Sequence, residues 1–156
     1  MADLIIRQFS AGNSLAALNP LLESSEQEGY RFLRRLYDDY VSASNRFDRP
    51  GEGLFVAWLR DRPVGMCGLN RDPFAHDDAA GRLRRLYVHP SVRRRGVGRS
   101  LVAAVVAEAR GTYRILRLRT DNPAAGAFYC ALGFSPAPSE TATHVLNLEK
   151  PLGLLP

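Results

Sequence analysis

The chain has 156 residues, 46% of them hydrophobic and 24% charged, which is the size and composition of one folded domain with a single core. No apolar stretch approaches the roughly 20 residues of a membrane span, and the N-terminus lacks the basic and apolar segments of a secretory signal. We therefore expect one cytoplasmic domain over residues 1–156, without membrane association. The formal net charge of +5 is compatible with a polyanionic partner. However, 20 of the 21 basic residues are arginines and only Lys150 is a lysine, so the codon composition of the gene is another explanation for the excess of positive charge.

The two cysteines give no sign of a cross-link or a metal centre. Cys67 and Cys130 lie far apart, with no CxxC pair and no histidine pair near either of them. We expect two reduced, buried thiols and no bound metal.

Three strands and a helical region are predicted in the first half of the chain. Strands are predicted at residues 4–9, 53–59 and 62–69, and the last two form a hairpin. Apolar residues recur every three or four positions from Phe32 to Val41, which predicts a helix there.

Another helix is predicted earlier, around Leu15 to Glu26, where Pro20 leaves two readings open. The helix either continues through Pro20 or is split there, with Asn19 capping a second turn that Pro20 opens.

In the second half, strands and helices alternate after the loop at residues 70–81. The predicted elements are a strand at 82–90, a helix beginning just after Gly98 and ended by Gly111, a strand at 113–120, a helix opened by Asn122 and ended by Gly133, and two final strands, one of them within 142–152. Together with the first half, this order indicates an α/β (α+β) domain.

The segment "YVHPSVRRRGVGRS", Tyr87 to Ser100, joins a strand to a helix through a glycine-rich turn. Free amides at a helix N-terminus and a glycine bend that admits a close oxyanion together favour phosphate binding. The turn is not a Rossmann fingerprint, because Leu101 stands where the third glycine belongs, and it is not a P-loop, because the lysine is missing.

The turn instead resembles the acetyl-CoA motif RxxGxG of the GNAT superfamily of N-acetyltransferases, with Arg93, Gly96 and Gly98 at the motif positions. A second stretch, "NPAAGAFYCALGF", is similar to the superfamily's N-x-x-A-x-x-F-Y-x-x-x-G-F pattern. The matching positions are Asn122, Ala125, Phe128, Tyr129, Gly133 and Phe134. The resemblance covers roughly residues 53–148.

This resemblance implies a GNAT fold: a mixed, mostly antiparallel sheet of about seven strands, about four flanking helices, and a splay between the fourth and fifth strands. It also implies acetyl-CoA as cosubstrate and a primary amine as acceptor. Homodimers are common in the superfamily, so the resemblance is compatible with a homodimer. The implied cofactor-binding residues are Leu86, Tyr87, Val88, Arg93, Arg94, Arg95, Gly96, Val97, Gly98, Arg99, Ser100, Asn122, Phe128 and Tyr129.

Tyr129 matches the superfamily's general-acid tyrosine. The superfamily's usual general base, in contrast, has no counterpart in this sequence. Arg82 stands where many relatives have a glutamate, and arginine does not deprotonate. The remaining base candidates are Glu52, Asp72, His76, Asp77, Asp78 and His144.

Two alternative functions and the role of three arginines stay open at this point. The domain could bind acetyl-CoA without catalysis, or it could bind nucleic acid, although its basic run lacks interleaved aromatic residues and a known DNA-binding pattern. By default, we interpret Arg82, Arg84 and Arg85 as part of a solvated or salt-bridged face. The other interpretation is that they attract an acidic substrate.

Overall fold

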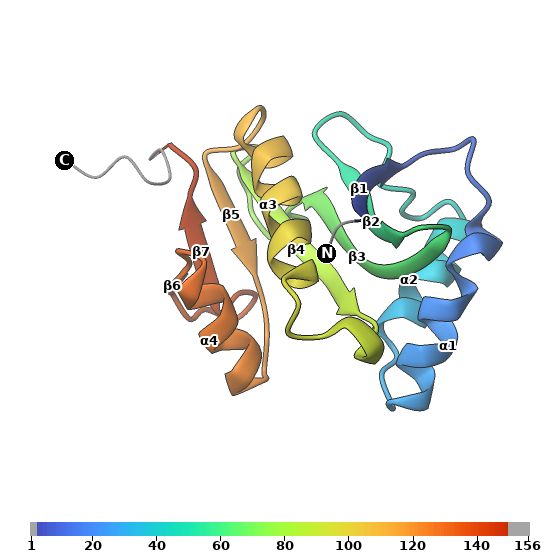
Figure 1. The fold of residues 1–156 in the computed structure, drawn as a ribbon. Helices are drawn as coiled ribbons and strands as arrows, with labels where there is room; N and C mark the ends of the chain where they lie inside the picture. The colour runs from blue at the N-terminus through green and yellow to red at the C-terminus, as the bar shows by residue number, and fades with distance from the viewer. Residues whose placement is uncertain (1–2, 150–156) are drawn as a thin grey trace.

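A seven-stranded sheet forms the centre of the computed structural model, which describes residues 3–149 (Figure 1). Its spatial order is β1-β2-β3-β4-β5-β7-β6. The strands are β1 (Leu4–Phe9), β2 (Gly53–Leu59), β3 (Arg62–Arg71), β4 (Ala80–Val88), β5 (Ile115–Leu118), β6 (Ser135–Pro136) and β7 (His144–Asn147).

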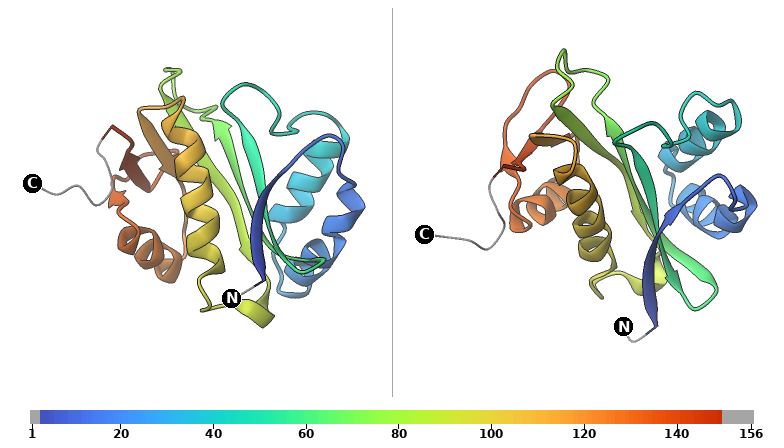
Figure 2. Two further views of the ribbon diagram at one scale, coloured as in Figure 1. Left: turned by 45° about the horizontal axis from the view of Figure 1, so that its top comes forward. Right: turned by 90° about the horizontal axis from the view of Figure 1, so that it is seen from above.

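Helices cover both faces of this sheet (Figure 2). Helices α1 (Asn19–Gln27) and α2 (Phe32–Val41) lie on one face, and α3 (Val97–Arg110) and α4 (Pro123–Ala131) lie on the other. Two 3-10 turns, η1 (Leu15–Leu18) and η2 (Pro90–Val92), precede α1 and α3. No helix within residues 3–149 is long and apolar enough to cross a membrane.

Each face has its own hydrophobic core, set by the apolar stripe of the helix that covers it. On one side Leu101, Val105 and Ala109 of α3 are fully buried against the sheet. On the other side Leu33 and Leu36 of α2 pack with α1 and the facing strand residues. Burying each large aliphatic side chain contributes about 1.5–3 kcal/mol, so these stripes dock the helices.

All pairings in the sheet are antiparallel except that of β4 with β5. Only three residue pairs join these two parallel strands, from Ala80 with Ile115 to Arg82 with Arg117. Beyond Arg82 no residue of β4 is paired with β5. The predicted seven-stranded mixed sheet and its splay are thus confirmed.

A bulge interrupts β4 just after the splay begins. Met66 and Gly68 of β3 pair with Tyr87 and Arg84 of β4, so three steps along β4 match two along β3. Arg85 absorbs the extra residue in a left-handed conformation, with φ of 65°.

Several predicted boundaries were wrong. Helix α1 is capped by Leu18, so Asn19 and Pro20 lie in its first turn, where a missing proline N–H costs nothing. Helix α3 begins at Val97 rather than after Gly98, because left-handed Gly96 is its cap.

Strands β5 and β7 are also shorter than predicted. β5 covers four residues of the expected 113–120, and β7 covers four residues of the expected 142–152, part of which lies outside the described residues. Cys67 is buried as predicted, but Cys130 is exposed because it lies on the outward face of α4.

Candidate functional site

The glycine-rich turn bends through two left-handed residues before α3 begins. Arg94 has φ of 64° and Gly96 has φ of 85°, and the helix starts at Val97. Glycine adopts this conformation without the steric cost that a Cβ imposes, and an added Cβ at Gly96 would meet no atom within 4 Å. The constraint at Gly96 is therefore conformational rather than steric.

The bend leaves a set of backbone donors at the start of α3 without an acceptor among residues 3–149. Ser100 is the first residue of α3 whose amide bonds back to the chain, to the carbonyl oxygen of Gly96 at 3.0 Å. The amides of Val97, Gly98 and Arg99 donate to no residue that the structure describes. Three N–H groups at the positive end of a helix dipole form an anion-binding arrangement.

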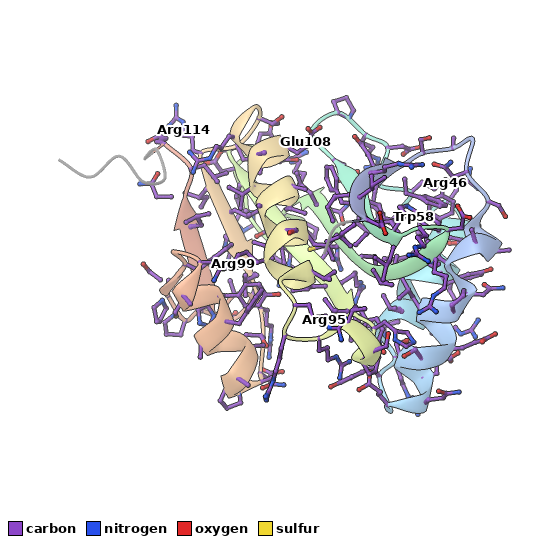
Figure 3. All side chains as sticks on the ribbon, in the orientation of Figure 1. Arg46, Trp58, Arg95, Arg99, Glu108 and Arg114 are labelled. Atoms are coloured by element: carbon purple, nitrogen blue, oxygen red, sulfur yellow. The ribbon has the colours of Figure 1, made fainter. Side chains whose placement is uncertain are left out.

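This turn lies against both strand β4 and helix α4. A Cβ added at Gly98 would stand 3.4 Å from Phe128 Cζ and 3.6 Å from Val88 Cγ2. The structure thus brings together three of the predicted cofactor-binding residues from three separate elements. Arg95 and Arg99 extend from the turn and from the first turn of α3 (Figure 3).

Arg93, the first residue of the motif, is bound to the protein itself. Its Nε donates to the Val88 carbonyl at 3.0 Å, and its two terminal nitrogens donate to both carboxylate oxygens of Glu28. Glu28 also accepts from the hydroxyl of Tyr87, which in turn contacts Ser24. The guanidinium therefore ties the turn to β4 and to the end of α1.

Charge and burial in this network shift the acidities of its members. The hydrogen bond from Arg93 lowers the pKa of Glu28 below its usual range and raises the pKa of the Arg93 guanidinium. Burial, followed by the hydrogen bond to Glu28, raises the pKa of Tyr87 to about 12. Sequence reasoning missed Glu28, since nothing near it in the chain signals a partner at Arg93.

Tyr129 is a buried side chain of α4 with an aromatic surround. Its ring centroid lies 5.2 Å from that of Phe128, 5.6 Å from Phe134 and 6.5 Å from the imidazole of His144. The hydroxyl makes no hydrogen bond with any described residue and keeps some access to solvent. Burial, and then the Cys67 thiol, raise the pKa of Tyr129, so the phenol stays protonated at neutral pH.

Asn122 caps α4, as predicted. Its side-chain oxygen accepts hydrogen bonds from the amides of Ala124 at 2.9 Å and Ala125 at 3.4 Å.

Arg82 belongs to a buried ion-pair triad with Asp72 and Arg117. The carboxylate of Asp72 lies 3.5 Å from Arg82 Nη1 and 2.7 Å from Arg117 Nη1, and all three side chains are largely buried. Arg82 also donates to the carbonyl of Thr141 at 2.6 Å and lies over the ring of Phe74. The salt-bridged interpretation of Arg82 is confirmed, and Asp72 is occupied by two arginines and is not a free base.

The other base candidates lie in different places. Glu52 accepts from the Arg71 amide at 3.2 Å and lines two open cavities of about 610 and 670 Å³. Asp77 and Asp78 lie on the β3–β4 loop, bound to the Ala79 amide and to Arg71.

His144 is the one candidate that the structure places beside Tyr129. Its Nδ1 lies 2.8 Å from the Thr143 hydroxyl. His76 is exposed on the β3–β4 loop. Among residues 3–149 no three histidine, cysteine or acidic side chains gather as a metal site.

Comparison with known proteins relates this chain to acetyltransferases. The model of the Acetyltransferase (GNAT) family matches residues 16–134. The chain is 44% identical over 77 residues to a mycothiol acetyltransferase of Clavibacter sepedonicus, and 36% identical over 75 residues to the N-alpha-acetyltransferase RimI of Mycobacterium tuberculosis. These matches cover 49% and 46% of this chain but only 23% and 44% of the two relatives.

The fold is similar along nearly the whole chain to a crystal structure from Exiguobacterium sp. 255-15, of a protein assigned as an acetyltransferase. The TM-score is 0.81 at 30% identity, and the match covers 93% of both chains.

Proposed function

Because the chain belongs to the Acetyltransferase (GNAT) family, we propose that it transfers an acetyl group from acetyl-CoA to a primary amine. The observation that carries this proposal is the turn at Gly96, where three amides without described partners lie at the start of α3 and against Val88 and Phe128. Such a turn suits a diphosphate, which is the most highly charged linkage of coenzyme A.

The residues present fit this cofactor. The amides of Val97, Gly98 and Arg99 would bind the diphosphate, with the exposed guanidiniums of Arg94, Arg95 and Arg99 as further charge partners. Backbone groups of β4 from Leu86 to Val88, which have no partner on β5, would bind the pantetheine arm. Arg93 contributes by holding the turn, since its side chain is bound to Glu28.

An acceptor amine must lose a proton before it can attack the thioester. For an ordinary lysine-like amine this costs about 4.6 kcal/mol at pH 7, given a pKa near 10.4. Asp72 binds both Arg82 and Arg117, and Arg82 carries no basic site, so neither Asp72 nor Arg82 removes that proton. His144 lies beside Tyr129 and is the candidate best placed to relay it.

Tyr129 would supply a proton to the departing thiolate. Its hydroxyl is neutral, makes no hydrogen bond with a described residue and keeps access to solvent. A phenol that remains protonated until the thiolate forms fits the role of a general acid.

Titration calorimetry with acetyl-CoA and a thiol-release assay with a panel of amines test this function. Saturable binding and amine-dependent thiol release are the expected results. A lack of acetyl-CoA binding would overturn the proposal, whereas binding without thiol release for any amine would favour a catalytically silent domain.

The Tyr129→Phe variant tests the general acid. We expect kcat to fall about 100-fold, the lower end of typical general-acid contributions, while acetyl-CoA binds as before. The matched control is Tyr37→Phe on α2, which removes a hydroxyl without a described hydrogen bond. Unchanged turnover in Tyr129→Phe would remove this residue from the mechanism.

A further inference from the structure

The bulge in β4 places two consecutive arginines on the same face of the sheet. Leu83 and Leu86 both pack against the core beneath α3, which strict alternation would forbid. The two residues between them, Arg84 and Arg85, therefore both fall on the opposite face, the one that α1 and α2 cover. Charges on α2 act on both guanidiniums, consistent with this placement.

These two guanidiniums are half-buried and have no close anion among residues 3–149. Neither side chain makes a hydrogen bond or an ion pair with any residue that the structure describes. Arg82 and Arg117, on the same face, differ in sharing the carboxylate of Asp72. Half-buried cations side by side are costly unless an anion compensates them.

The charges around the pair do not cancel. Burial and the neighbouring Arg84, Arg35 and Arg82 lower the pKa of Arg85 to about 10, and Asp39 opposes this shift. The negative charges of Asp39, Asp72 and Glu52 raise the pKa of Arg84 against the effect of burial. Asp72, however, is already bound by two other arginines.

The pair also lies where an acceptor would approach. Arg84 and Arg85 follow Arg82, the last residue of β4 that pairs with β5, and precede the unpaired strand backbone that would bind pantetheine. Arg84 also lines the open cavity of about 670 Å³, together with Asp39, Asn45, Glu52 and Asn70.

Resting on the proposed function, we infer that the acceptor amine carries an anionic oxygen group, a carboxylate or a phosphate, which Arg84 and Arg85 bind. A guanidinium fork matches both groups, with two parallel N–H···O bonds to each. The acceptor's anion would supply the close counter-charge that Arg84 and Arg85 do not have among residues 3–149, and would orient its amine toward the splay.

Anion binding tests the inference without knowledge of the acceptor. The full chain is first saturated with coenzyme A, so that the turn at Gly96 is occupied, and is then titrated with glutarate or inorganic phosphate at constant ionic strength. We expect saturable binding of at least one anion. Loss of one charge-assisted pair in Arg84→Gln or Arg85→Gln should weaken this binding about tenfold.

The matched control is Arg114→Gln, which removes an exposed arginine paired with Glu149 at the far end of β5 (Figure 3). Its anion affinity should equal that of the wild type. Thermal unfolding of each variant verifies that it is folded, and the two single variants provide independent tests. If coenzyme A binds but neither anion does, this inference is wrong while the proposed function stands; if coenzyme A itself does not bind, the proposed function fails first.

Turnover of matched acceptor amines is a second test, and it distinguishes a carboxylate from a phosphate as the bound group. Each pair consists of an amine that carries the anionic group and a similar amine that lacks it. The pairs are 4-aminobutanoate with 4-aminobutanamide, and O-phosphoethanolamine with ethanolamine. We expect kcat/KM at least tenfold higher for the charged member of one pair, with the ratio lost in Arg85→Gln. Equal kcat/KM within both pairs would overturn the inference, and if no amine in the panel reacts, the anion titration decides.

Discussion

At the scale of single residues, Gly96 and Gly98 lie in one turn under different constraints. Gly96 is left-handed, so Gly96→Ala should lower the free energy of unfolding by about 1 kcal/mol. At Gly98 a Cβ would make only ordinary contacts, and Gly98→Ala should leave stability unchanged or raise it by about 0.5 kcal/mol. Both variants should bind acetyl-CoA more weakly, because a methyl group hinders close approach to the amides. Thermal unfolding with and without acetyl-CoA measures both effects, and equal destabilisation by the two substitutions would contradict this account.

At the scale of elements, Glu28 joins the end of α1 to the turn before α3 through Arg93. In Glu28→Gln one charge-assisted pair is lost, so we expect a loss of about 1 kcal/mol in unfolding free energy and severalfold weaker acetyl-CoA binding. Glu26→Gln is the control, since Glu26 pairs with Arg34 on the neighbouring helix and away from the turn. Weaker acetyl-CoA binding of similar size in both variants would show that Glu28 has no specific positioning role.

The same contact predicts a pH dependence. The pKa of Glu28 is lowered from 4.5 in the folded chain, mainly by its hydrogen bond with Arg93. A lowered pKa contributes stability above the ordinary value and loses it as pH falls through the folded value. The stability difference between wild type and Glu28→Gln should therefore be full at pH 7 and shrink below about pH 4.5, as urea unfolding at several pH values can test. A difference that grows on acidification would contradict the assignment.

At the scale of the whole molecule, Asp72 binds strands from the two parts of the sheet. Only three backbone pairs join β4 to β5, and the triad with Arg82 and Arg117 reinforces them. Removing the charge in Asp72→Asn leaves two buried arginines without a counter-ion, so we expect a loss of about 3–5 kcal/mol. Asp78→Asn, which breaks an exposed pair with Arg71, should cost less than about 1 kcal/mol. Urea unfolding measures both, and similar losses in the two variants would refute the role of the triad.

Much of the fold was predictable because its signals are local. The helix from Phe32 to Val41 follows from the spacing of its apolar residues, and the cap at Asn122 follows from a side chain that bonds amides two and three residues ahead. Predictions weakened where packing decides the outcome. Cysteine is a residue type that is usually buried, so the sequence predicts a buried Cys130. In the structure only Tyr129 of α4 is buried, and the thiol of Cys130 is exposed to solvent.

By itself, the sequence determined the elements, their order and the glycine turn, because periodicity, caps and left-handed positions act over a few neighbouring residues. Only the tertiary structure decided which charges meet. Glu28 reaches Arg93, Asp72 reaches Arg117, and the bulge turns Arg84 and Arg85 onto one face. Charge partners are selected by the approach of distant segments, and the hydrophobic burial that docks those segments depends on no particular pairing of charges.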